Sequence, residues 1–245
     1  MKYRKVIAVF FASLLVPSCG IEENFYLPQV PQNSITRQLN TDATIVLPAL
    51  DQYYYAQSYL IYYRIYISGT FTGADIQSPS ERGSISTDLA NDFNSINPYA
   101  DPTSQTSSNV SGILTGRGYF ELELDGANIS SFLPASGGTV TISFPENTGY
   151  PAMSFNNGQE VRLRRSSELI SPQPVGDLYF RNSDELSDPA NSNSNTNADV
   201  ASRSGGSTGF AYASMYIVAA GLDTASFRQI YSKPTHISIF KLPNN

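Results

Sequence analysis

The stretch that decides the fold of this chain is Tyr59-Leu60-Ile61-Tyr62-Tyr63-Arg64-Ile65-Tyr66-Ile67. Aromatic and β-branched residues, which are enriched in β-strands, occupy both of its faces. A strand with apolar side chains on both faces needs cover on both sides, as strands in the middle of a sheet have. We therefore predict a strand over Tyr59–Ile67 at the centre of a sheet.

Alternation of apolar and polar residues predicts further strands on both sides of this stretch. Such half-buried strands are typical of antiparallel sheets. In the last of them, alternation places His236 on one face with Ser238 and Phe240. The predicted strands cover Thr41–Leu47, Tyr119–Leu124, Thr139–Phe144, Glu160–Arg165, Gly209–Gly221 and Thr235–Leu242.

Helical signals are few. Ser86 or Thr87 is a suitable cap for a short helix that carries Leu89, Phe93 and Ile96 along one face and ends at Pro98. The fold class predicted from these patterns is mainly β, an antiparallel β-sandwich with a few short helices.

The chain begins with the features of an export signal. Lys2, Arg4 and Lys5 precede an apolar run over 6–16, and Val16-Pro17-Ser18-Cys19 places small residues before the only cysteine. A helix over this run reaches roughly half of the ~30 Å hydrocarbon core of a bilayer, so it is too short to span one. A secretory signal cleaved elsewhere, with Cys19 a bystander, is the alternative.

This segment resembles the signal and lipobox of bacterial lipoproteins. In that family the cysteine sulfur is diacylated, the preceding peptide bond is cut, and the new amino group usually receives a third chain. The resemblance implies a signal peptide over 1–18, a lipidated tether over 19–38, and anchoring through Cys19 to a membrane of the bacterial cell envelope, at the outer membrane or on the periplasmic face. The Tyr-rich strands are also similar to those of uncharacterised spirochaete lipoproteins.

Charge and cysteine content restrict the partners and the means of stabilisation. Removing residues 1–18 takes away three basic side chains and no acidic one, so the formal net charge goes from −6 to −9. A surface of this sign repels phosphate backbones, and we expect no nucleic-acid partner. With a single cysteine the chain forms no internal disulfide, so burial of apolar surface must stabilise it.

The strands near the two ends of the chain resemble those of fibronectin type III domains. Thr41–Leu47 and Tyr59–Ile67 are similar to the second and third strands of that family, and 216–221 with 232–240 to its last two, although the family's tryptophan is missing. The resemblance implies one sandwich domain over 39–245, with 70–207 inserted. Within the insertion, Asn182–Ser207 is polar and is expected to be a mobile loop that is dispensable for folding.

Candidate catalytic residues are scarce. His236 is the only histidine, and we interpret it as a strand residue with its ring at the sheet surface. Glu121 and Glu123 lie two positions apart on one predicted strand face, roughly 6.6 Å along the strand, which overlaps the carboxylate spacing of glycosidases. Acidic residues on a solvent face are the commoner explanation of that pattern.

The motifs of other site classes are missing from the sequence. No nucleotide-binding loop or calcium loop occurs, so neither a cofactor nor a metal site is predicted. Tyr53-Tyr54-Tyr55 is either a ligand platform on a loop or the start of a strand.

The predicted function is a non-catalytic binding or structural role in the cell envelope, with an unknown protein or small molecule as partner. One alternative is an envelope hydrolase that uses Glu121, Glu123 or His236. Another is a lipoprotein that captures lipid or solute in an apolar cavity between the sheets. A cavity lined by Tyr and Phe would favour capture of a lipid or solute. Carboxylates clustered in a cleft would favour the hydrolase. A filled core with flat polar faces would favour the binding or structural role.

Overall fold

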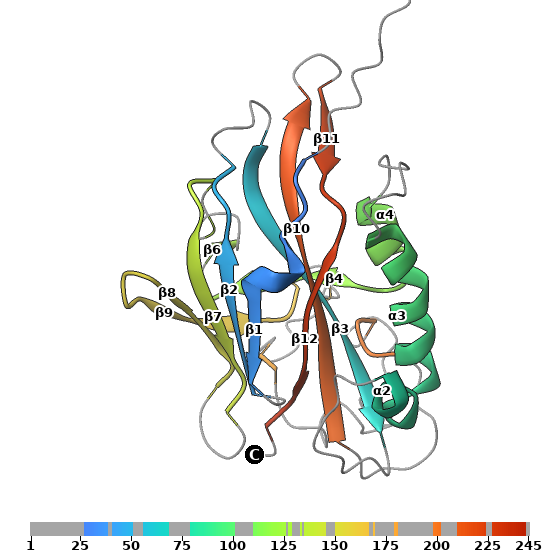
Figure 1. Cartoon of the computed structure of the whole chain (residues 1–245). Coiled ribbons are helices and arrows are strands. Elements are labelled where there is room, and N and C mark those ends of the chain that lie inside the picture. The colour runs from blue at the N-terminus through green and yellow to red at the C-terminus, as the bar shows by residue number, and fades with distance from the viewer. Residues whose placement is uncertain are drawn as a thin grey trace, which may run out of the picture.

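Two antiparallel sheets face each other, and α-helices cover the outer side of one of them (Figure 1). In Figure 1 the seven-stranded sheet lies on the left, the five-stranded sheet in the middle and the helices on the right. The predicted fold class, an antiparallel β-sandwich, is confirmed. This computed structural model describes residues 27–38, 41–50, 56–68, 79–100, 110–125, 127–128, 133, 135–145, 150–166, 169, 179–180, 198–201, 210–223 and 227–243.

The tyrosine-rich stretch forms β3 (Ala56–Ser68) inside the five-stranded sheet, as predicted. It pairs on one side with β10 (Phe210–Asp223) along nearly its whole length and on the other side with the short β4 (Phe120–Glu121). β10 in turn pairs with β11 (Arg228–Tyr231) near its end and with β12 (Thr235–Lys241) along its first half. β3 is therefore covered by strands on both edges.

The seven-stranded sheet takes most of its strands from the middle of the chain. β2 pairs along its full length with β7, so the segment 70–207 supplies strands that complete the sandwich. Its two hairpins β1–β2 and β8–β9 flank β7 on either side. The strand order is β1 (Ile35–Gln38), β2 (Asp42–Leu47), β7 (Gly138–Ser143), β8 (Ala152–Phe155), β9 (Glu160–Arg164), β5 (Glu123–Leu124) and β6 (Ala127–Asn128).

The predicted strand over 119–124 is divided between the two sheets. β4 pairs with β3, whereas β5 pairs with β9. Leu122 lies between them, is fully buried, and donates its backbone N–H to the carbonyl of Ile61 at 2.8 Å. The chain passes from one sheet to the other here because its apolar side chains stay in the interior while the backbone turns at a corner of the sandwich.

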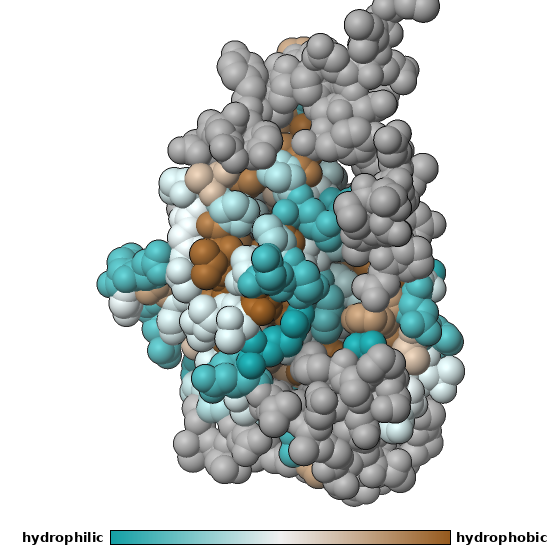
Figure 2. Space-filling view, viewed as in Figure 1, coloured by the Kyte–Doolittle hydropathy of each residue, from teal (hydrophilic) through white to brown (hydrophobic). Residues whose placement is uncertain are grey.

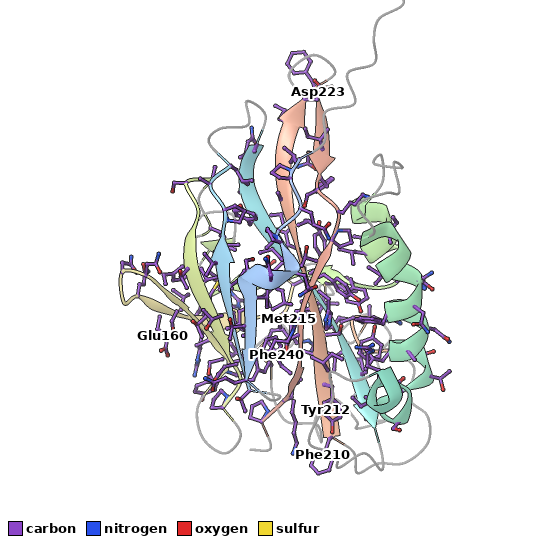
Figure 3. All side chains as sticks on the ribbon, viewed as in Figure 1. Glu160, Phe210, Tyr212, Met215, Asp223 and Phe240 are labelled. Atoms are coloured by element: carbon purple, nitrogen blue, oxygen red, sulfur yellow. The ribbon has the colours of Figure 1, made fainter. Side chains whose placement is uncertain are left out.

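Side chains from both ends of the chain meet between the sheets. The core cluster includes Ile45, Ile65 and Ile217, all fully buried, which confirms the predicted inward set. The rings of Phe144 and Phe240 stack across the interior with centroids 4.7 Å apart. Figure 3 shows Met215 and Phe240 in this layer.

The described helices agree with the prediction of a few short helices, but only one of them was located from the sequence. The predicted helix is α3 (Thr87–Ala100), whose Leu89 and Ile96 are buried. The Ser86 hydroxyl accepts a hydrogen bond from the Asp88 N–H and caps it. The helix continues two residues beyond Pro98. The short helices α2 (Pro79–Ile85) and α4 (Val110–Thr115) lack a periodic apolar face long enough to be seen in the sequence.

A β-bulge in β12 places Phe240 on the opposite face of the strand from His236, contrary to the prediction. Met215 pairs with Ser238 and Tyr216 pairs with His236, so Ile237 is an extra residue. Such a bulge breaks the two-residue alternation. Phe240 therefore faces the interior, whereas His236 faces the helices.

Part of the predicted tether belongs to the sandwich. Leu27 and Val30 are buried in the core cluster, and β1 pairs with β2. The Arg37 side chain donates hydrogen bonds to the carbonyls of His236 and Ile237 at 2.8 and 2.6 Å. The domain thus begins before residue 39, because these apolar residues and side-chain donors cover the edge of β12.

The predicted mobile loop also contains a packed segment. The Ile65 N–H donates to the Asp199 carbonyl at 2.9 Å, and the Ala201 N–H donates to the Ile65 carbonyl at 2.8 Å. The Asp199 carboxylate is fully buried and paired with Arg165. The expectation of mobility is therefore wrong for 198–201, since a long-range ion pair and backbone bonds hold these residues. Residues 182–197 and 202–207 lie outside the described part of the chain.

Candidate functional site

Two of the predicted sites lie outside the described residues. They are the lipidation residue Cys19 and the cluster Tyr53-Tyr54-Tyr55. Both remain predictions from the sequence.

The structure separates the surroundings of the two candidate carboxylates. Glu121 lies in β4 opposite Tyr62 of the five-stranded sheet. Glu123 lies in β5 opposite Arg164 of the seven-stranded sheet. Both side chains are half-buried. A glycosidase pair must flank one scissile bond in one cleft, and these two residues belong to different sheets.

His236 is buried beneath the helices, so the interpretation of a ring at the sheet surface needs correction. Only 7% of the residue is exposed. Its ring meets Phe93 of α3 edge to face at 5.1 Å and Tyr216 of β10 at 5.0 Å. The guanidinium carbon of Arg82 lies over the ring of Phe93, 3.6 Å from its centroid. Alternation placed His236 correctly on the side away from the core, although not Phe240, and it contained no information on the helices that cover this side.

The surroundings of His236 favour its neutral form. Burial, followed by the charges of Arg37 and Arg82, holds the pKa of the imidazole well below its usual value of 6.5. Its Nε2 has no hydrogen-bond partner among the described residues. No carboxylate is paired with it in the part of the chain that the structure describes, so nothing there orients the ring as a general base.

A second buried group, Asp92 of α3, joins the helix layer to the sheet. Its carboxylate accepts hydrogen bonds at 2.6 Å from the Arg64 guanidinium and the Tyr66 hydroxyl, and at 3.2 Å from Arg117. The Tyr66 hydroxyl also lies 3.0 Å from that of Tyr119. A carboxylate with two cations and a phenol is well compensated inside a protein.

The phenols of this network stay protonated. Burial raises the pKa of Tyr119 to about 12 and that of Tyr66 well above 10.0. They therefore act as hydrogen-bond donors throughout the physiological range. We interpret the Asp92 network as the link that holds α3 on β3, since the contacts of Asp92 with Arg64 and Tyr66 run from the helix to that strand.

The outer face of the seven-stranded sheet has a different character. Its strands alternate, with Ala43, Ile45 and Leu47 of β2 inward and small polar side chains outward. The hydroxyl residues Thr36, Thr44, Thr141 and Ser154 form one row across β1, β2, β7 and β8. All the described α-helices lie on the opposite side of the molecule (Figure 1). We call this surface the open face.

The side chains of the open face are partly exposed and form local contacts. The hydroxyls of Thr44 and Thr141 are 3.0 Å apart, and the Ser143 hydroxyl donates to Asp42 at 2.5 Å. Val46 is 55% exposed in the same sheet. Figure 2 shows the surface over β2 and β7 as mostly pale, the colour of intermediate hydropathy, with small brown areas.

The open face carries a stack of aromatic rings and a cation at β9. The Arg162 guanidinium carbon lies 3.1 Å from the ring centroid of Tyr150 and 4.6 Å from that of Tyr179. The Tyr179 hydroxyl donates to Asp125 at 3.1 Å, and Asp125 pairs loosely with Arg164 at 3.9 Å. Tyr150 is 51% exposed. We call Tyr150, Arg162 and Tyr179 the Tyr–Arg stack.

The Tyr–Arg stack has the chemistry of a contact site for another molecule. Tyrosine and arginine offer large, stiff contact areas and are enriched among residues that dominate binding energies. The sequence contained only part of this signal, namely Arg162 and Arg164 on the outward face of a predicted strand. Tyr150 and Tyr179 lie outside any predicted strand, so only the fold brings them to Arg162.

Within the described ranges, no three His, Cys, Asp or Glu side chains come together as metal ligands. None of the helices described is both long and apolar enough to cross a bilayer.

Comparison with known proteins gives no relative. No family model, no curated protein and no solved structure matches this chain.

Proposed function

We propose that this chain is an acylated protein of the bacterial cell envelope, anchored to a membrane through Cys19, with a non-catalytic binding or structural role. The anchor rests on the basic residues, apolar run and small residues that precede Cys19. Two or three acyl chains hold a protein to a bilayer far more firmly than one, at about 0.8 kcal/mol per buried methylene.

The observation that carries the binding role is the open face with its exposed Tyr–Arg stack. The opposite side of the sandwich is covered by helices, whereas this side presents hydroxyl groups, Tyr150 and Arg162. The direct contact of Phe144 and Phe240 across the interior weighs against capture of a lipid between the sheets. The separate surroundings of Glu121, Glu123 and His236 weigh against a hydrolase.

The anchor is tested by metabolic labelling with a fatty-acid analogue. Wild-type protein should take up label and sediment with membranes, and Cys19→Ala should remain an unlabelled precursor, because the modification requires the thiol. Equal label in the two proteins would exclude acylation at Cys19.

The binding role is tested by photo-crosslinking in intact cells. A photoreactive residue is placed at Thr141 or Tyr179 on the open face, and at Asn94, which is exposed on α3, as the matched control. We expect adducts from the open face that are lost in an Arg162→Ala background, and none from Asn94. Adducts that form equally at Asn94, or that persist unchanged in the Arg162→Ala background, would contradict a role for the open face.

A further inference from the structure

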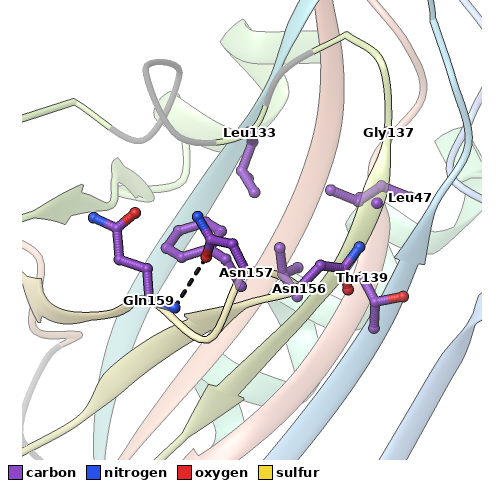
Figure 4. A pocket seen from close by; sticks show the side chains of 10 residues that line it. Leu47, Leu133, Gly137, Thr139, Asn156, Asn157 and Gln159 are labelled. Carbon is purple, nitrogen blue, oxygen red and sulfur yellow. Dashed lines mark hydrogen bonds between the residues drawn. The ribbon is translucent and has the colours of Figure 1, made fainter.

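A pocket opens at one end of the seven-stranded sheet, where three of its strands stop (Figure 4). It lies where β2 ends at Leu47, β7 begins at Gly138 and β8 ends at Phe155, next to the turn that leads into β9. Its volume is 340 Å³. Ligand sites range from about 300 to 1,000 Å³, so this one fits a small molecule.

The floor of the pocket is apolar and firmly held. Leu47, Leu133 and Val140 belong to the core cluster and are almost fully buried, and Phe155 packs against the same cluster. A floor made of core side chains keeps its shape without a ligand. Apolar surface of this kind suits the C–H face of a ring.

The backbone at the start of β7 keeps the pocket open. Gly138 has φ of 142°, in the region that favours glycine. A Cβ at this position would lie 3.2 Å from the side-chain nitrogen of Asn156, tight enough to displace that side chain from the rim.

The rim of the pocket consists of uncharged hydrogen-bonding groups. Asn156, Asn157 and Gln159 come from the turn, and Thr139 comes from β7. The side-chain Oδ1 of Asn157 accepts a hydrogen bond from the Gln159 backbone N–H at 2.9 Å, which holds the turn. The side-chain amides of Asn156 and Gln159 make no hydrogen bond to any described residue and are exposed to solvent. Figure 4 shows the side chains of Asn156 and Gln159 on one side of the pocket, below Leu133 and Leu47 in this view.

The combination of groups selects a class of ligand. Among the described residues that line the pocket there is no acid or base, although 15% of the chain is charged, so none of them offers a charged ligand a counter-ion. A side-chain amide donates and accepts at once, and so does a hydroxyl group. We propose that this pocket binds a neutral, hydroxyl-bearing ring, a single sugar residue, with its C–H face on the apolar floor and its hydroxyls on the amides of Asn156 and Gln159.

The proposal is tested by titrating the full-length protein with glucose, galactose, mannose and N-acetylglucosamine while following its backbone amide resonances. At least one sugar should shift the resonances of 138–140 and 155–159 with a dissociation constant in the millimolar range. The double variant Asn156→Ala/Gln159→Ala should raise the dissociation constant at least tenfold, because each neutral hydrogen bond that is lost raises it by up to about tenfold. Gln38→Ala removes an exposed amide from β1, outside the pocket, and should change nothing.

The fold of the double variant is checked by its unfolding temperature, which should equal that of the wild type because neither amide bonds to any residue that the structure describes. N-acetylalanine methylamide, a neutral peptide unit, and glucuronate, a charged sugar, are titrated alongside. The proposal is overturned if the peptide unit or glucuronate binds as tightly as the best sugar. It is also overturned if no sugar shifts these resonances at roughly 100 mM, or if the double variant binds unchanged. These outcomes are independent of the open face and of acylation.

Discussion

At the scale of single residues, His236 is a titratable group enclosed by rings and cations. Phe93 and Tyr216 cover its ring, and Arg37 and Arg82 disfavour a further positive charge. In the unfolded chain the imidazole titrates near 6.5. The unfolded state therefore binds a proton in a pH range where the folded state does not.

We predict that His236 makes the free energy of unfolding fall as the pH drops below about 6.5. The decline should approach 1.4 kcal/mol per pH unit until the lowered folded pKa is reached, and stability should be independent of this group above pH 6.5. His236→Phe keeps a ring between Phe93 and Tyr216 and should remove this decline. Urea unfolding at intervals between pH 7.5 and 5.5 measures it, and an unchanged slope in the variant would contradict the assignment.

At the scale of elements, residues 198–201 act as a short added strand on β3. Val200 forms a parallel bridge with Ile65. The neighbouring Asp199 is fully buried, and its carboxylate accepts the Arg165 Nε–H at 2.7 Å. Removing one partner of a buried ion pair leaves an uncompensated charge and is far costlier than replacing both.

Asp199→Ala should therefore lower the free energy of unfolding by roughly 3 to 5 kcal/mol. The double variant Arg165→Met/Asp199→Leu should recover most of that loss, because no charge is then buried. Replacing Ser192–Ser202 by a Gly-Ser linker should also cost more than about 1 kcal/mol, unlike the replacement of an ordinary surface loop. Chemical denaturation of Asp199→Ala, of the double variant and of the linker variant measures their free energies of unfolding. A linker variant as stable as the wild type would return this segment to the class of dispensable loops.

At the scale of the whole molecule, the two ends of the chain share one core. Ile45 of β2, Ile65 of β3 and Ile237 of β12 belong to the same cluster. β12 pairs with β10, which pairs with β3, and the N-terminal residues 29–37 bond to β12 through their side chains. No strand of this set buries its apolar face by itself.

Loss of the final strand should accordingly unfold strands far from it in the sequence. A chain that ends before Thr235 should lose amide-exchange protection in β2 and β3 as well as in β10. Ile65→Ala in the full chain should cost roughly 2 to 5 kcal/mol as a buried large-to-small change. Protection of 61–67 that survived the truncation would mean that the two ends form separate folding units.

Local patterns in the sequence determined much of the sandwich. β2, β3, β7, β9, β10 and β12 were all predicted, because alternating side chains reveal a buried face wherever a strand is long enough. The start of α3 was predicted from its cap. The short β8 and β11 were not, since four residues carry too little pattern to exceed chance.

The tertiary structure decided what lies against each face. The ring of His236 was predicted to lie at the sheet surface, yet it lies beneath α3, and Ile237 becomes the extra residue of a bulge. The Tyr–Arg stack and the rim of the pocket likewise join segments that are separate in the sequence. An amino-acid pattern records which side of a strand is apolar. It does not record which distant segment covers that side, because that choice depends on the burial gained by the whole chain at once.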